Sequence, residues 1–185
     1  MEIPIELKAL FSIGHSNHSL EKFLGLLTMH EIDVVVDVRS KPYTRYATHF
    51  SAPHIQKFIG DAGLKYLFFG KEMGGKPDRQ DYYDEQGRID YTKIAASCFF
   101  RSGITRLKKG LLTYRVALMC GEENPAGCHR RHLIARVASE DGVTVQHIRG
   151  DGRIEIESDL LLAEREQDRD NGQLKLFAPS TRPLM

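Results

Sequence analysis

The β-branched run IDVVVDV at residues 32–38 constrains the fold more than any other part of this chain. It is too continuously apolar to alternate between a buried and an exposed face, so it predicts a strand that is covered on both faces. Strands of this kind are typical of parallel sheets, whose crossover connections place helices on either side. We therefore expect an α/β fold built around residues 32–38.

Strand and helix patterns alternate along the rest of the chain. An apolar segment at residues 7–13 predicts a first strand, and apolar residues recur at helical spacing after the N-cap candidate Ser19. Further strands are expected at 65–69, 115–119 and 144–148, and further helices at 51–61, 91–109 and 129–139. This order predicts a three-layer fold with a mainly parallel five-stranded sheet and helices on both faces, rhodanese-like or Rossmann-like.

The length of 185 residues fits one domain with a short appendage. We expect a single α/β domain over residues 1–155, an acidic helix over 156–170, and a flexible tail over 171–185 that Gly and Pro interrupt. The three cysteines are an odd number and no signal-peptide pattern precedes them, which favours a reducing cytoplasm. No apolar run approaches the roughly 18 residues of a membrane span, so no membrane role is expected.

A formal net charge of +1 gives no global attraction for nucleic acid. Any basic surface must therefore be local. The two candidate clusters are Arg39, Lys41 and Arg45, and Arg101, Arg106, Lys108 and Lys109.

Polar motifs follow all five predicted strands, and ligands of open parallel sheets bind at the carboxyl ends of the strands. The motifs are GHSNHS, DVRSKP, FGKEMGGK, CGEENPAGCHRRH and HIRGDGR. Small residues let a backbone approach a ligand closely, and arginine pairs with phosphate or carboxylate. The anion-binding candidates are Gly14, Ser16, Arg39, Ser40, Gly74, Gly75, His129 and Arg130.

The candidates for catalysis are His15, Asp37, Glu122 and Cys128. Cys128 stands at the expected start of a helix and is followed by two arginines, a setting that lowers the pKa of a thiol and favours bound anions. Asp37 is either a general base or a structural partner of Arg39. Glu122 is the other acid–base candidate.

Residues 120–132, here called the cysteine loop, allow two other interpretations. Cys120, Cys128, His129 and His132 are potential zinc ligands, although no cofactor is predicted and their spacing is not that of a zinc motif. Taken alone, Cys120 is a buried thiol at the end of a core strand. Cysteine phosphatases carry an arginine six positions after the nucleophile, but Ala126 and Ile134 stand at those positions here.

The chain resembles the bacterial protein family catalogued as domain of unknown function 488, over roughly residues 11–148. The segments that carry the resemblance are SIGHSN with FLGLL, VVVDVRSKP, KYLFFGKEMGGKP and ALMCGEENPAGCHRRHLIA. The family pattern falls on Gly14, His15, Ser16, Asp37, Arg39, Pro42, Gly74, Gly75, Cys120, Glu122, Cys128, His129 and Arg130. The resemblance implies no particular reaction.

The segment QLKLF at residues 173–177 resembles the pentapeptide by which bacterial repair and replication proteins bind the DNA sliding clamp. In such peptides the glutamine sets the orientation and the apolar side chains enter a pocket. The partner-binding candidates are Gln173, Leu174, Leu176 and Phe177. The alternative is that these apolar residues pack back onto the domain or form an edge strand.

These observations favour an enzyme that acts on a phosphate-bearing substrate, a nucleotide or nucleic acid, with a link to DNA repair or replication through the tail. A non-catalytic module that binds nucleic acid or the clamp would use the same arginines. A thiol enzyme of the sulfurtransferase kind is a third possibility, because rhodaneses share the strand that ends in DVR and the late cysteine loop.

Overall fold

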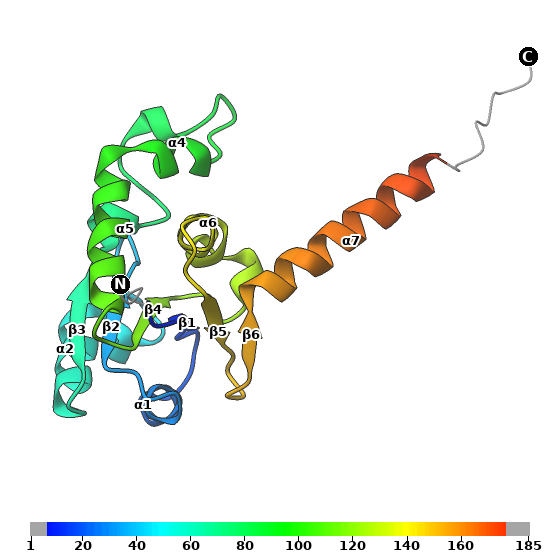
Figure 1. The fold of residues 1–185 in the computed structure, drawn as a ribbon. Coiled ribbons are helices and arrows are strands. Elements are labelled where there is room, and N and C mark those ends of the chain that lie inside the picture. The colour runs from blue at the N-terminus through cyan, green and yellow to red at the C-terminus, as the bar shows by residue number, and fades with distance from the viewer. Residues whose placement is uncertain (1–6, 177–185) are drawn as a thin grey trace, which may run out of the picture.

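Six strands form one sheet, in the order β3-β2-β4-β1-β5-β6 (Figure 1). The structure is a computed structural model that describes residues 7–176, with the backbone alone for residues 168 and 170–176. The strands are β1 (Leu10–Gly14), β2 (Val34–Asp37), β3 (Lys65–Phe68), β4 (Val116–Cys120), β5 (Val145–Ile148) and β6 (Ile154–Ile156). The first five are parallel, and β6 runs antiparallel to β5.

The α/β class and the mainly parallel sheet agree with the sequence prediction, but the count of five strands was wrong. The sixth strand arises because the chain reverses after β5: the amide of Arg149 donates to the carbonyl of Arg153, and Gly152 takes a positive φ of 88°. The strand order also differs from the dinucleotide-binding order 3-2-1-4-5-6, since β4 lies between β1 and β2.

Helices cover both faces of the sheet and complete three layers (Figure 1). They are α1 (Leu20–Met29), α2 (Ala52–Asp61), α3 (Gly70–Met73), α4 (Tyr91–Ala96), α5 (Cys98–Leu111), α6 (Arg136–Glu140) and α7 (Glu157–Leu176). One core joins α1 and α2 to one face through Phe23, Leu27 and Ile55. The other core joins α4, α5 and α6 to the opposite face.

Two helices predicted as continuous are divided. The segment 91–109 breaks at Ser97, whose hydroxyl accepts a hydrogen bond from the amide of Phe100 and caps α5. The segment 129–139 begins as a π-helical turn, η4 (Arg130–Ala135), before α6.

The last helix, α7, leads away from the sheet (Figure 1). It continues to Leu176, beyond the predicted end at residue 170, so the backbone of Gln173, Leu174 and Leu176 is helical. Phe177 lies outside the described residues. Between residues 7 and 176, none of the helices combines the length and apolar character that a bilayer crossing needs.

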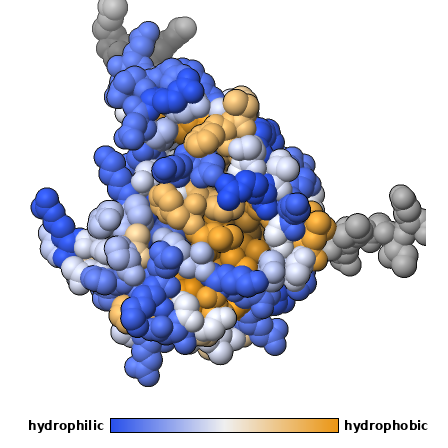
Figure 2. Space-filling view, turned by 90° about the vertical axis from the view of Figure 1, so that its left-hand side faces the viewer, coloured by the Kyte–Doolittle hydropathy of each residue, from blue (hydrophilic) through white to orange (hydrophobic). Residues whose placement is uncertain are grey.

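Strand β3 forms one edge of the sheet and is less covered than the central strands. β1, β2 and β4 are buried throughout, whereas Leu67 and Phe68 of β3 are exposed. Figure 2 shows an apolar area between hydrophilic surroundings on this side of the molecule. The helices therefore cover the middle of the sheet more completely than this edge.

The carboxyl ends of β1, β2 and β4 meet at one edge because these strands are parallel neighbours. Gly14 is in register with Cys120, and Asp37 with Met119. From β2 the chain passes to α2 on one face, and from β4 it passes to η4 and α6 on the other. Adjacent strands whose connections diverge in this way leave a crevice between them, which is where α/β folds bind ligands.

Candidate active site

A cleft of about 860 Å³ opens at the ends of these strands. Its walls come from the loops after β1, β2, α3 and β4. Of the residues singled out in the sequence, His15, Arg39, Ser40, Gly75, Cys120, Glu122, Cys128 and His129 line it. Gly14, Ser16, Asp37, Gly74 and Arg130 are not among the lining residues.

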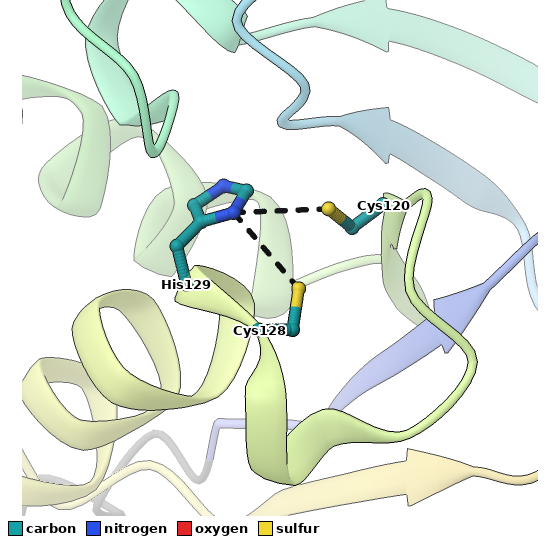
Figure 3. A group of neighbouring side chains, drawn as sticks. All are labelled: Cys120, Cys128 and His129. Atoms are coloured by element: carbon teal, nitrogen blue, oxygen red, sulfur yellow. Dashed lines mark hydrogen bonds between the residues drawn. The ribbon is translucent and has the colours of Figure 1, made fainter. Parts of the chain in front are cut away.

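The loop after β4 folds back over the end of its own strand. Asn124 accepts a hydrogen bond from the amide of Ala126 and caps the 3-10 turn η3 (Pro125–Gly127). Cys128 follows in an extended conformation, so the chain returns toward Cys120. Nδ1 of His129 lies 3.7 Å from Sγ of Cys120 and 3.9 Å from Sγ of Cys128 (Figure 3).

The ring of His129 has a defined orientation. Its Nε2 lies 3.1 Å from the carbonyl oxygen of Val38, which can only accept, so Nε2 carries a proton and Nδ1 is the ring nitrogen that faces the thiols and can accept a proton from one of them. Gly75 packs against His129 near Cβ, Cγ and Nδ1, and a Cβ at position 75 would overlap these atoms. The loop after β2 and the loop after α3 thus both hold His129.

The electrostatic surroundings distinguish the two thiols. A hydrogen bond from Cys128, together with His129 and the charge of Arg130, holds the pKa of Cys120 far below its usual range, although burial opposes this. The pKa of Cys128 is raised, because its thiol donates to Cys120 and is buried. The hydrogen bond between the two thiols thus favours the thiolate form of Cys120 and the protonated form of Cys128.

The sequence analysis chose Cys128 as the nucleophile, whereas the directions of the two pKa shifts favour Cys120. The sequence placed Cys128 at a helix N-terminus, but it lies before the turn η4 and acts as a donor. Cys120 was considered as a core thiol or a metal ligand, because nothing in the spacing shows that the loop returns to it. The signal that could have identified it is its position at the end of a buried parallel strand.

Three residues in this loop could bind a metal ion. The donor atoms of Cys120, Cys128 and His129 lie within 4.8 Å of one another. His132 does not join them, because its Nε2 donates to the carbonyl oxygen of Ala126 at 2.5 Å. Two thiolates and one imidazole would leave the fourth position of a tetrahedral zinc open, as in catalytic zinc sites.

Asp37 is a structural partner of Arg39. Its carboxylate is fully buried and accepts hydrogen bonds from the Arg39 amide, from Nε and NH2 of the guanidinium, and from the hydroxyl of Tyr66. Burial and the neighbouring Asp37 raise the pKa of Tyr66, so that hydroxyl remains a donor. With all these donors in place, Asp37 orients Arg39 and is not positioned as a general base.

Arg39 in turn orients His15 on the cleft wall. Its NH1 donates to Nε2 of His15 at 3.1 Å, while Nδ1 of His15 donates to the carbonyl oxygen of Ser16. The ring stacks on Phe50 with centroids 4.4 Å apart. Burial lowers the pKa of His15 to about 4, so the imidazole is neutral near pH 7.

Arg130 does not face the cleft, which corrects its assignment as an anion clamp. It is 0% exposed and donates to Ser12 Oγ and to the carbonyl oxygens of Glu122 and Glu123. Gly14 lies beneath the same loop, where a Cβ would collide with the carbonyl of Glu122. Arg130 therefore holds the backbone of the cysteine loop by hydrogen bonds, and Gly14 leaves the space that this backbone occupies.

Three small residues, Ser40, Gly74 and Ser16, lie in the loops around the cleft. Ser40 Oγ accepts a hydrogen bond from the amide of Lys76 at 2.8 Å. A Cβ at Gly74 would overlap the side chain of Ser40 and the carbonyl of Gly70, so only glycine fits there. Ser16 adopts a positive φ of 43° in the turn after β1. Ser16 and Gly74 fix loop geometry, whereas Ser40 both connects two loops and lines the cleft.

A family model described as "Domain of unknown function DUF488" matches residues 19–137. The match covers more than half of the chain. The protein belongs to this family. The matched part of the DUF488 domain contains β2, β3, β4 and the cysteine loop, whereas β1 with His15 precedes it and β5, β6 and α7 follow it. Neither the comparison with curated proteins nor the comparison with solved structures gives a match.

Proposed function

We propose that this DUF488 protein is a thiol-dependent enzyme that acts on a phosphate-bearing substrate, with Cys120 as its nucleophile. The observation that carries the proposal is the approach of His129 Nδ1 to the thiol of Cys120 in the cleft, 3.7 Å away. A nucleophile, a base within reach and a third group that orients the base are the parts that covalent catalysis requires. Here the third group is the carbonyl of Val38.

The reaction follows from these positions. Cys120 starts as a thiolate whose proton is held on Nδ1 of His129, and this thiolate forms a bond to the electrophilic atom of the substrate. The bond from that atom to the leaving group breaks, and His129 returns the proton to the leaving group. The imidazole then takes a proton from water, the hydroxide forms a bond to the same atom, and the bond from that atom to Cys120 breaks, which restores the thiolate beside the protonated His129.

The cations of the cleft favour a phosphate group on the substrate. Lys41 and Lys76 line the cleft beside Arg39, and neither lysine forms an ion pair with another side chain that the structure describes. The acids on the same walls are Asp78 and Glu122. A phosphate between the two lysines would place the rest of the substrate over Cys120, and Glu122 remains a second candidate for proton transfer at the rim.

The test is a substrate screen with the purified protein, using nucleotides and other phosphorylated compounds. We expect turnover that Cys120→Ser abolishes and that the matched control Cys98→Ser, at an exposed thiol on α5, leaves unchanged. Intact-mass measurement during turnover should show an adduct that maps to Cys120. Equal turnover by Cys120→Ser would refute the proposal, and binding without turnover by any substrate would favour a non-catalytic module.

A further inference from the structure

We infer that the substrate of this cleft is a single-stranded nucleic acid whose bases stack on Tyr43 and Tyr46 and whose phosphates bind Lys41, Arg45 and Lys76. The identification of this ligand as the substrate rests on the proposed function. The binding surface itself rests on separate observations on residues 40–47, the segment between β2 and η1 (Thr48–Phe50). We call this segment the rim loop.

The rim loop presents two tyrosine rings to solvent. Tyr43 is 72% exposed and Tyr46 is 100% exposed. Large aromatic rings are normally at least partly buried, and an exposed pair beside cations is the arrangement that proteins use to stack bases of single strands. The bases of a duplex already stack on one another, so these rings favour a single strand.

The rim loop is anchored although its tyrosines are exposed. The carbonyl of Pro42 accepts from the amide of Ala52, and the amide of Thr44 donates to Ser51 Oγ. Ala47 is buried in the core that faces α1 and α2. The backbone that carries the tyrosines is therefore held in place before any ligand binds, which reduces the entropy cost of binding.

The charges of the rim loop are available to a ligand. Lys41, Arg45 and Lys76 form no ion pair with other residues in the described part of the chain. The basic cluster on α5 differs, because three of its four members are paired. Arg101 and Lys108 lie 3.7 and 3.2 Å from Asp141, and Arg106 pairs with Glu72. Of the two local basic clusters, the rim loop is the one that can neutralise phosphates.

The rim loop is continuous with the cleft. Lys41 and Tyr43 line both the cleft that contains Cys120 and a shallower hollow of about 520 Å³ formed by residues 40–45. Lys76 faces the same cleft and is connected to the loop through Ser40. A strand stacked on the two tyrosines would therefore pass the cations and deliver one nucleotide to Cys120.

The test measures fluorescence anisotropy of labelled oligothymidylate and oligouridylate with full-length Cys120→Ser protein, which binds without turnover. Tyr43→Ala and Tyr46→Ala should each weaken binding about fivefold or more, whereas the phenylalanine variants should retain it. Lys41→Gln and Lys76→Gln should weaken binding and lower the slope of log affinity against log salt by about 0.7 each. Lys108→Gln is the matched control and should have no effect.

The two oligonucleotides show whether the ligand is DNA or RNA. Binding of a duplex as tight as that of the single strand, or full affinity in the Tyr43→Ala/Tyr46→Ala protein, would overturn the inference. If oligonucleotides do not bind while Cys120-dependent turnover of a small phosphorylated compound persists, this inference fails and the proposed function stands. If they bind through the tyrosines but no Cys120-dependent reaction is found, the surface stands and the enzyme proposal fails.

Discussion

At the scale of single residues, the site depends on which of two neighbouring thiols holds the proton. Cys120 and Cys128 both face Nδ1 of His129, and only one of them can be the acceptor of their shared hydrogen bond. Arg130 lies below the loop and favours negative charge on Cys120. The choice of Cys120 as the nucleophile therefore depends on the side chains buried around it, Cys128, His129 and Arg130.

The first prediction concerns the reactivity of Cys120. Because its pKa is lowered, the thiolate persists as pH falls below neutral, whereas an ordinary thiol with a pKa of about 8.5 is protonated there. Alkylation of Cys120 by iodoacetamide, followed by peptide mass spectrometry, should proceed at nearly the same rate from about pH 6 to pH 8. A rate that rises tenfold per pH unit would contradict the assignment. Stoichiometric zinc in protein purified without added metal would replace the free thiolate with a metal site.

The second prediction concerns the packing of Gly75 against His129. In Gly75→Ala the added methyl must displace the imidazole from the thiols. We expect Cys120-dependent turnover to fall by about tenfold or more, since small displacements of catalytic groups have effects of this size. Gly60→Ala on α2, where a Cβ meets no atom within 4 Å, is the control and should be neutral. Unchanged turnover in Gly75→Ala would mean that the position of His129 is not important.

At the scale of elements, the turn η4 connects the cysteine loop to α7. Arg130 points toward the loop, whereas Arg131 donates to Glu157 and Glu164 of α7. A series of buried hydrogen bonds links Arg130 to α7: Arg130 donates to Ser12 Oγ, which lies 2.6 Å from His147 Nδ1, and His147 Nε2 lies 2.7 Å from Glu157. The first turn of α7 is thus fixed to the sheet through Glu157, which is buried together with its partners Arg131 and His147.

The third prediction tests this attachment. Glu157→Ala leaves Arg131 with one acceptor fewer and His147 without its carboxylate, so the free energy of unfolding in urea should fall by about 3 kcal/mol or more. The control is Glu140→Ala, which removes an exposed pair with Arg136 and should cost less than about 1 kcal/mol. Equal losses in the two variants would show that burial of the Glu157 network does not matter.

At the scale of the whole molecule, much of the fold could be predicted from the sequence. The buried β-branched strand around residues 34–36 and the alternation with helices led to the parallel sheet, and the sheet led to a site at its carboxyl edge. The direction of individual side chains could not be predicted. Arg130 is adjacent in sequence to His129 of the cleft, yet it donates to Ser12 and to carbonyl oxygens of the returning loop. The pairing of Asp37 with Arg39 was one of the two predicted roles, whereas its other partner, Tyr66, comes from β3. The short strand β6 was missed because its three residues follow a tight turn.

The fourth prediction concerns the far end of α7. The segment Gln173–Phe177 is proposed to bind a DNA sliding clamp, and the helix that carries most of it leads away from the sheet (Figure 1). Leu176→Ala together with Phe177→Ala should abolish binding to an immobilised bacterial clamp, at an affinity near micromolar for the unmodified protein. The melting temperature should not change. Destabilisation by more than about 2 kcal/mol would assign these residues to the core instead.

Arg130 holds the cysteine loop through hydrogen bonds to main-chain carbonyl oxygens, so the exposed side chains of that loop are free to vary. Carbonyl groups are the same whatever residue carries them, so the path of the loop does not depend on the side chain at position 122. Glu122, Ala126 and Gly127 are exposed around the opening of the cleft. Related proteins and engineered variants can therefore exchange these residues to suit new ligands while the nucleophile and its histidine keep their places.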